Sequence, residues 1–231
     1  MSNEIQPDWA HYGEYAPRND RMAEFWLRPT IDHLKESLAL QSGPAQQNIL
    51  DYGCSHFDLG VSINACVDGY DPDKGAIEYA MQRVAAFSGD KPVLTCSLEE
   101  IPEEKYNWIV ANSVVQYFSG NSEFEKFIEN CACKWLKHGN SNILITDVIP
   151  IRYSKPMDAI ENILVAARGG FLIPMLKHMV RAAARPASLK LTRYKVSTIL
   201  EIAGRHGFRG QVLEKNLTPS RRRYTVLLSQ L

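Results

Sequence analysis

The sequence lacks the features that mark several large classes of protein. It contains no run of about 18 uncharged apolar residues, so no membrane-spanning helix is expected. Its first ten residues are polar, which predicts no secretory signal. None of its five cysteines forms a CxxC pair, and the spacing of Cys131 and Cys133 does not suit a zinc site. No metal-ligand cluster, internal repeat or low-complexity segment is found. These absences favour a cytoplasmic protein with reduced cysteines and no bound metal.

Charge is unevenly distributed along the chain. The 231 residues, 45% of them hydrophobic, suit one domain with a sizeable core, and their formal net charge is zero. Residues 1–150 hold 11 Lys and Arg against 22 Asp and Glu, whereas residues 151–231 hold 15 against 4. The basic carboxyl-terminal part suggests an anionic partner, although the two parts could also neutralise each other across a shared interface.

The stretch 48–60 contains the strongest local pattern. It predicts a buried strand, a sharp turn at Gly53 and a helix that begins near Asp58. A strand, a glycine turn and a helix N-terminus together form a common cradle for nucleotide-like ligands. Twenty positions after Asp51, a second short strand ends in Asp71, which is placed to accept hydrogen bonds from ribose hydroxyls.

These two patterns resemble the first two motifs of class I S-adenosylmethionine-dependent methyltransferases. That family usually reads Asp-x-Gly-x-Gly-x-Gly, and here Ser55 and Phe57 stand at the second and third glycine positions. Glycine permits positive φ and close approach of the backbone to a ligand. We therefore expect Ser55 to narrow the approach while offering a hydrogen bond, and Phe57 to wall off part of the pocket.

Later segments extend the resemblance over residues 45–150 and 196–231. Ser97 and Leu98 stand where the family binds the adenine ring. Residues 106–118 are similar to the family's fourth strand and its exit, with Asn112 at the carboxyl end of the strand. Residues 142–149 match the fifth strand and place Asp147 near its end, close to the expected acceptor.

The resemblance implies an α/β fold. It is a Rossmann-like, doubly wound and mostly parallel seven-stranded sheet with an antiparallel last strand and a helical insert that serves as a lid. Residues 1–47 form an N-terminal arm and helix, and residues 48–150 form the cofactor-binding core. Residues 151–196 form the insert, and residues 197–231 supply the last helix and the final strands that complete the core.

The resemblance also implies S-adenosylmethionine as cofactor and S-adenosylhomocysteine as product. Tyr12, Tyr15 and Arg18 match an N-terminal tyrosine and arginine that close over the methionine end in many relatives, with a surface arm as the alternative. The predicted cofactor-binding residues are Tyr12, Tyr15, Arg18, Gly53, Cys54, Ser55, Asp71, Pro72, Ser97, Leu98 and Asn112.

The insert is predicted to contain two basic amphipathic helices, at 157–168 and 174–184, joined at Gly169-Gly170. As a lid, it would suit an anionic small-molecule acceptor. The alternatives are a homodimer face and contact with an anionic membrane surface.

Two residues are predicted to be catalytic, His178 in the insert and Asp147. A hydroxyl acceptor benefits from a general base. Gln116 stands where many small-molecule methyltransferases have histidine, so this position does not supply the histidine base that those relatives have.

The leading functional hypothesis is O-methylation of a small, saccharide-like or phosphate-bearing acceptor, in carbohydrate biosynthesis. An RNA methyltransferase is an alternative, but no basic tail, RNA-binding module or Asn-Pro-Pro-Tyr motif supports a nucleic-acid partner. The other alternative is a non-catalytic relative that has lost its cofactor, for which Ser55, Phe57 and Ser97 are the evidence.

Overall fold

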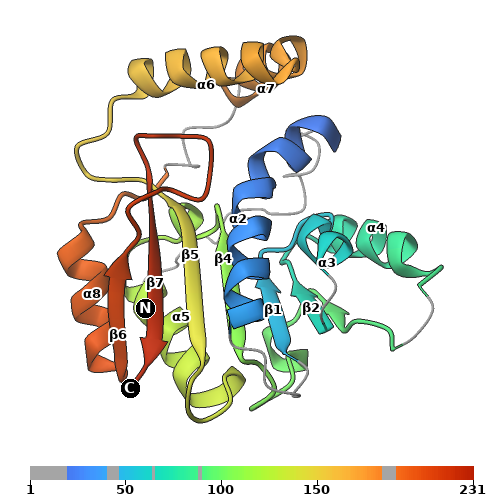
Figure 1. The fold of residues 1–231 in the computed structure, drawn as a ribbon, viewed down its shortest axis with the longest axis vertical. Helices are drawn as coiled ribbons and strands as arrows, with labels where there is room; N and C mark the ends of the chain where they lie inside the picture. Colours follow the sequence, from blue (N-terminus) through green and yellow to red (C-terminus); the bar gives the residue numbers. More distant parts are fainter. Residues whose placement is uncertain (1–19, 41–46, 64–65, 88–89, 184–190) are drawn as a thin grey trace, which may run out of the picture.

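The structure, a computed structural model, describes residues 20–40, 47–63, 66–87, 90–183 and 191–231. Its centre is a seven-stranded sheet with the order β3-β2-β1-β4-β5-β7-β6 (Figure 1). The strands are β1 (Asn48–Tyr52), β2 (Cys66–Tyr70), β3 (Leu94–Thr95), β4 (Trp108–Asn112), β5 (Asn142–Val148), β6 (Phe208–Val212) and β7 (Tyr224–Gln230).

Strands β1 to β5 pair in parallel, and β7 runs antiparallel to both β5 and β6. This arrangement confirms the predicted α/β fold with its mostly parallel sheet and antiparallel last strand. The chain starts in the middle of the sheet at β1, builds outward to β2 and β3, and then crosses back to β4. Such a reversal opens a crevice at the carboxyl ends of β1 and β4, where ligands of open α/β sheets bind.

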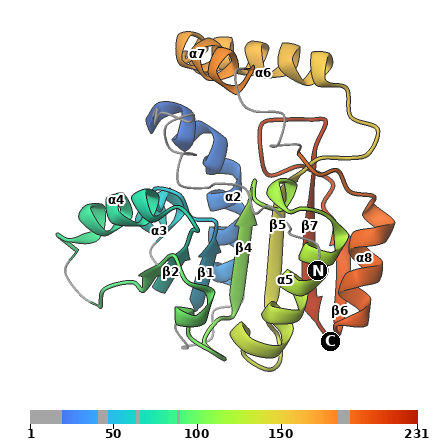
Figure 2. The same ribbon diagram turned by 180° about the vertical axis from the view of Figure 1, so that it is seen from behind.

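Helices cover both faces of the sheet (Figures 1 and 2). Hydrophobic side chains of α2, α3 and α4 form one core cluster, and those of α5 and α8 form the other. Successive strand residues point to opposite faces, so Val110 packs in the first cluster and Ile109 in the second. The helices are α2 (Asp20–Leu40), α3 (Asp58–Ser62), α4 (Lys74–Val84), α5 (Asn121–Asn130), α6 (Lys155–Gly169), α7 (Leu172–Ala183) and α8 (Val196–Arg205).

The insert between β5 and α8 forms a helical hairpin, α6 and α7, beyond the carboxyl ends of the strands (Figures 1 and 2). The two helices meet near Gly169-Gly170, as predicted, and Gly170 has a φ of 73°. Phe171 anchors the hairpin to α2, because its ring centroid lies 5.1 Å from that of Phe25 and 6.4 Å from that of Trp26. The hairpin therefore stands at the end of the sheet where a ligand would bind.

Two features are absent from the described residues. No helix within them is long and apolar enough to cross a membrane. No three His, Cys, Asp or Glu side chains gather there in a way that could hold a metal ion.

Candidate cofactor and acceptor site

The turn after β1 is tied to the end of β2. The backbone N–H groups of Gly53 and Cys54 both donate to the carbonyl oxygen of Tyr70, at 2.7 and 2.9 Å. Gly53 has a φ of 79°, and a Cβ placed on it would lie 2.4 Å from a methyl carbon of Val114. Only glycine satisfies both the conformation and the close approach at this position.

Ser55 and Phe57 keep the loop conformation that glycine would adopt. Their φ angles are 47° and 60°, in the left-handed region that non-glycine residues seldom enter. The Ser55 N–H donates to the Asp71 carboxylate at 2.8 Å, which holds the loop against the end of β2. The loop therefore has the backbone shape of a glycine motif without its second and third glycines.

The expectation that Phe57 walls off the pocket is wrong. Its side chain is 1% exposed and packs inside the core cluster beneath α3. Gly60 and Gly69 leave room for the ring, since a Cβ on either residue would lie 2.1 or 2.9 Å from its atoms. The substitution at the third glycine position therefore fills the core and does not obstruct the crevice.

Asp71 lies at the carboxyl end of β2 with both carboxylate oxygens directed to backbone donors. One oxygen accepts from Ser55 N–H, and the other accepts from Asp73 N–H at 2.9 Å. Burial raises its pKa, while these two hydrogen bonds oppose the rise. Each oxygen retains a lone pair, so the carboxylate can also accept from ligand hydroxyls.

Two further predicted cofactor residues lie beside this turn. Pro72 is exposed. Cys54 is buried, and burial raises the pKa of its thiol well above the ordinary value.

Asp51, which the sequence motif contains but the predicted site omits, is a buried acid near the carboxyl end of β1. Its side chain is 4% exposed. Burial raises its pKa well above the ordinary range, and the nearby carboxylates of Asp71 and Asp58 raise it further. Of these two carboxylates, Asp58 is paired with Arg83 at 2.6 Å, whereas Asp71 accepts hydrogen bonds from backbone N–H groups. A cationic ligand group near Asp51 would stabilise its ionised form.

The remaining predicted cofactor residues lie near the same edge. Ser97 N–H donates to the Thr95 hydroxyl at 3.0 Å, and the Ser97 hydroxyl donates to Glu99 at 2.6 Å. Leu98 begins a short 3-10 turn and packs, half-buried, on the core. At the end of β4, the amide oxygen of Asn112 accepts from the hydroxyls of Thr30 and Thr146. Tyr12, Tyr15 and Arg18 lie outside the described residues.

Asp147, at the end of β5, belongs to a buried ion pair. Its side chain accepts hydrogen bonds from Arg223 at 2.6 Å and from the hydroxyls of Ser113 and Thr218, both at 2.9 Å. Burial raises its pKa, and the arginine and the two hydroxyls counteract that rise. Asp147 therefore has partners on both carboxylate oxygens.

Arg223 is the residue that sequence analysis missed. Besides Asp147, its guanidinium donates to Asp158 on α6 at 3.2 Å and to the amide oxygen of Gln116 at 3.3 Å. It also lies over the Tyr153 ring, 5.8 Å from the centroid. The available signal in the sequence is the run of three arginines at 221–223, directly before the last strand. Arg223 thus joins the sheet to the helical hairpin.

His178 was also predicted to be catalytic. It lies on α7, in the hairpin above the strand ends, but its side chain is outside the described structure. Its role stays a prediction.

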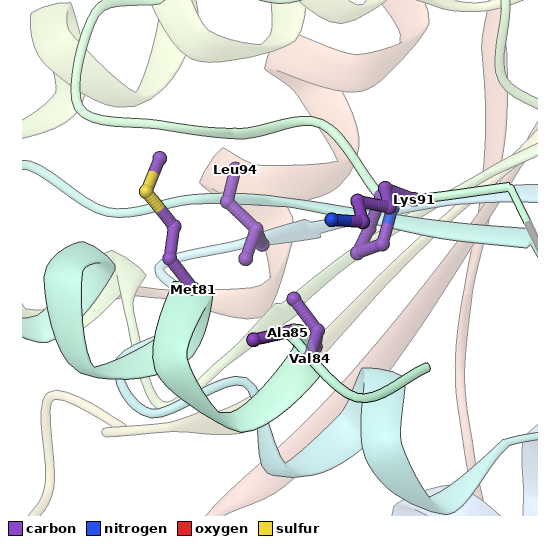
Figure 3. Close-up of a pocket in the computed structure, with 6 residues that line it drawn as sticks. Met81, Val84, Ala85, Lys91 and Leu94 are labelled. Atoms are coloured by element: carbon purple, nitrogen blue, oxygen red, sulfur yellow. The ribbon is translucent and has the colours of Figure 1, made fainter. Parts of the chain in front are cut away.

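A shallow apolar pocket lies elsewhere, between α4 and the segment that leads into β3 (Figure 3). Met81, Val84 and Leu94 line it, with Lys91 at one side. It opens near the amino-terminal end of β3, whereas Gly53, Asp71 and Asn112 follow the carboxyl ends of their strands. The pocket is therefore separate from the candidate site.

Comparisons with known proteins give a fold but not a reaction. No protein-family model and no curated protein matches the sequence. Magnesium protoporphyrin IX methyltransferase from Synechocystis, with bound S-adenosylhomocysteine, aligns at 16% identity and a TM-score of 0.57, over 99% of this chain and 87% of that one. A Leishmania major S-adenosylmethionine-dependent methyltransferase aligns at 16% identity and a TM-score of 0.61, over 96% of this chain and 83% of that one.

A structure described as a pericyclic reaction enzyme aligns as well, at 12% identity and a TM-score of 0.54, over 86% of this chain and 46% of that one. Similar folds therefore occur in proteins with different descriptions, and function has to be argued from the site. The strand order, the turn at Gly53 and the alignments agree on the architecture. The chain has the Rossmann-like fold of class I S-adenosylmethionine-dependent methyltransferases.

Proposed function

We propose that this protein is an S-adenosylmethionine-dependent methyltransferase. The observation that carries the proposal is the arrangement of Asp51 and Asp71 around the turn at Gly53. The turn brings bare backbone to the crevice, Asp71 offers acceptors for ribose hydroxyls, and Asp51 offers a buried carboxyl group whose ionised form a cationic group would stabilise. S-adenosylmethionine carries complementary groups for the two acids: ribose hydroxyls for Asp71, and an ammonium and a sulfonium as cations for Asp51.

In this proposal each element of the crevice has a binding role. Gly53, Cys54 and Ser55 line the cofactor with backbone, and Pro72 covers it beside Asp71. Ser97 and Leu98 contact the adenine through backbone groups and apolar surface, and Asn112 lies at the strand end near the methionine moiety. The bound cofactor would supply an electrophilic methyl group, while the protein aligns the acceptor with it, which can account for most of the acceleration.

For the acceptor we propose a small saccharide-like or phosphate-bearing molecule that is methylated on a hydroxyl. Exposed cations near the hairpin support an anionic acceptor, among them Arg152 and Arg193. Asp147 supports Arg223 and the strand end in this scheme, because its two oxygens already accept three hydrogen bonds. His178 is then the remaining candidate for the general base.

Thermal unfolding with S-adenosylhomocysteine tests the cofactor assignment. A ligand at 100 times its dissociation constant stabilises a protein by about 2.7 kcal/mol, which corresponds to a rise in Tm of roughly 5–10 °C at this size. We expect Gly53→Ala and Asp71→Ala to reduce that rise strongly.

Gly139→Ala is a matched control for the glycine substitution. Gly139 has the same φ of 79° as Gly53, but a Cβ placed on it would meet nothing within 4 Å. Both variants carry the same backbone strain, and only Gly53→Ala introduces the clash in the crevice. A full ligand-induced rise in Gly53→Ala and Asp71→Ala would remove this site assignment.

The acceptor is tested separately, by release of S-adenosylhomocysteine with phosphorylated and neutral sugars. Faster turnover with the phosphorylated members is expected. If S-adenosylhomocysteine has no effect on Tm, the non-catalytic alternative becomes the better description. A salt-dependent interaction with RNA would instead favour the RNA methyltransferase alternative.

A further inference from the structure

The α6–α7 hairpin exposes two apolar stripes. On α6 the stripe comprises Met157, Ile160 and Leu164, and the last two are 52% and 53% exposed. On α7 it comprises Ile173, Leu176 and Val180, with Ile173 and Val180 at 69% and 72%. The spacing of three and four residues places each set on one side of its helix.

The opposite side of the hairpin is already occupied. Among the described side chains of the hairpin, the buried apolar ones are Ala166, Phe171 and Met175, which form a cluster with Trp26 of α2. The exposed stripes therefore take no part in the contacts that attach the hairpin to the rest of the described structure. A set of exposed apolar side chains on adjacent helices is typical of a docking surface.

The charge of this region identifies the kind of partner. The two acids of α6, Asp158 and Glu161, are paired with Arg223 and Arg222. From residue 162 to residue 200 the sequence has no Asp or Glu and seven cations, of which Arg185 and Lys190 lie outside the described residues: Arg168, Lys177, Arg181, Arg185, Lys190, Arg193 and Lys195. Arg168 and Lys177 are exposed on the hairpin itself, beside the apolar stripes. A partner with an apolar interior and a negatively charged surface would satisfy both features.

A second copy of the chain would cover the apolar stripes but would not match the positive charge of the hairpin. A two-fold dimer places the same patch of each subunit against the other, so the cations of two hairpins would be brought together. Such a juxtaposition of like charges is unfavourable. An anionic lipid bilayer offers apolar depth and negative head groups at once, and amphipathic helices with lysine and arginine beside their apolar face bind it in this way.

We propose that the α6–α7 hairpin binds the surface of an anionic lipid bilayer, with its apolar stripes in the interfacial region and its cations against the head groups. The hairpin stands beyond the carboxyl ends of the strands (Figures 1 and 2), so this orientation turns the candidate site toward the membrane. The binding requires no cofactor and stands independently of the proposed methyltransferase activity.

Sedimentation with vesicles tests the proposal on the full-length protein. The vesicles contain either phosphatidylcholine alone or phosphatidylcholine with roughly one-third phosphatidylglycerol, which supplies the negative surface. Binding is expected to the mixed vesicles, and it should weaken when the salt concentration rises from about 0.05 M to about 0.5 M.

Two double variants separate the contributions. Ile173→Glu/Val180→Glu and Arg168→Glu/Lys177→Glu should each weaken binding to the mixed vesicles by roughly tenfold or more. Leu231→Glu and Lys74→Glu are the matched controls, because both residues are exposed and lie outside the hairpin. These controls should bind as the unmodified protein does, and circular dichroism checks that all variants are folded.

Three results would overturn the proposal. One is the absence of binding to either vesicle, and another is equal binding to both. The third is equal binding by the hairpin variants and the controls. If the protein instead sediments as a dimer that Ile173→Glu/Val180→Glu dissociates, and no vesicle binds, then a second copy covers the stripes.

Discussion

Phe57 occupies a backbone conformation that usually belongs to glycine. A non-glycine residue in the left-handed region costs about 1–2 kcal/mol, and the structure places both Ser55 and Phe57 there. For Phe57 the cost is offset by burial of the whole ring against Gly60 and Gly69. For Ser55 the compensation is the backbone hydrogen bond to Asp71. The two departures from the glycine pattern therefore have different physical origins.

Substitution at the two positions should have opposite effects on stability. Phe57→Ala removes a fully buried ring and is expected to lower the free energy of unfolding by about 3–5 kcal/mol. Ser55→Gly keeps the backbone N–H and relieves the strained φ, so a change within about 1 kcal/mol is expected, in the stabilising direction. Urea denaturation measures both. A small effect of Phe57→Ala would mean that the ring does not pack as described.

Asp51 should make the stability of the ligand-free protein depend on pH. Because folding raises its pKa, the folded state still holds the proton at pH values where the unfolded chain has lost it. The contribution of Asp51 to the free energy of unfolding is therefore fully present below the ordinary aspartate pKa of about 3.9. This contribution is lost as the pH rises through the pKa that Asp51 has in the folded state. Asp51→Asn should remove this loss and raise the free energy of unfolding of the ligand-free protein at pH 7.

The same substitution should weaken binding of S-adenosylmethionine, because the negative charge that faces the cation is gone. Denaturation across a pH series and calorimetric titration measure the two effects. Asp32→Asn, on the exposed side of α2, serves as the control and should change neither. If Asp51→Asn destabilises the free protein at pH 7, the carboxylate has a structural partner and the proposed role fails.

At the scale of elements, Arg223 connects β5, α6 and the start of β7. Its guanidinium is paired with Asp147 of β5 and Asp158 of α6, and the side chains of all three residues are mostly buried. Tyr153 and Ser220 donate to Asp158 as well, which fixes the N-terminal part of α6. The position of the hairpin above the strand ends thus depends on one arginine outside the hairpin.

Removal of that arginine should be costly. Arg223→Met leaves two buried carboxylates without their cation, and a loss of about 3–5 kcal/mol is expected. Arg222→Met is the matched control: its ion pair with Glu161 is long, at 3.6 Å, and its side chain is 41% exposed. The control should lose less than about 1 kcal/mol. Equal losses in the two variants would show that the Asp147–Arg223–Asp158 network does not stabilise the fold.

At the scale of the whole molecule, the sheet and the hairpin differ in how they are stabilised. Strand β5 is buried along its full length and β4 along most of it. The α6–α7 hairpin has a small cluster of its own and lies outside the two main clusters. Regions with few buried apolar contacts open at lower free energy than the core.

Hydrogen exchange should therefore separate two parts of the chain. Amides of β4 and β5 are expected to exchange only by global unfolding, and those of α6 and α7 should exchange faster by local opening. Helices α5 and α8 are the internal control, since they pack on the sheet and should exchange slowly although they are helical. Exchange as slow in α6 and α7 as in β5 would make the hairpin part of the cooperative core. Mass spectrometry of peptic peptides measures all of these segments.

The sequence by itself determined much of the architecture, because the spacing of apolar residues within one segment is enough to indicate a strand or a helix and its buried face. The pattern predicted a strand before Gly53 and a second strand that ends at Asp71, and β1 and β2 lie at these positions. Strand β3 has only two residues, Leu94–Thr95, at the edge of the sheet. The position of Gly53 and Asp71 at the carboxyl ends of two neighbouring strands also followed from the motif.

Only the tertiary structure decided how side chains far apart in the chain meet. The two carboxylate partners of Arg223 lie 65 and 76 residues away, and no local pattern connects them. Nor does sequence periodicity indicate where a loop side chain points, so Phe57 was expected in the pocket and is found in the core. The physical reason is the same in both cases. The spacing of apolar residues along a strand or helix indicates which of its faces is buried. Contacts between loops depend instead on the sheet topology, because it decides which strand and helix ends lie next to one another.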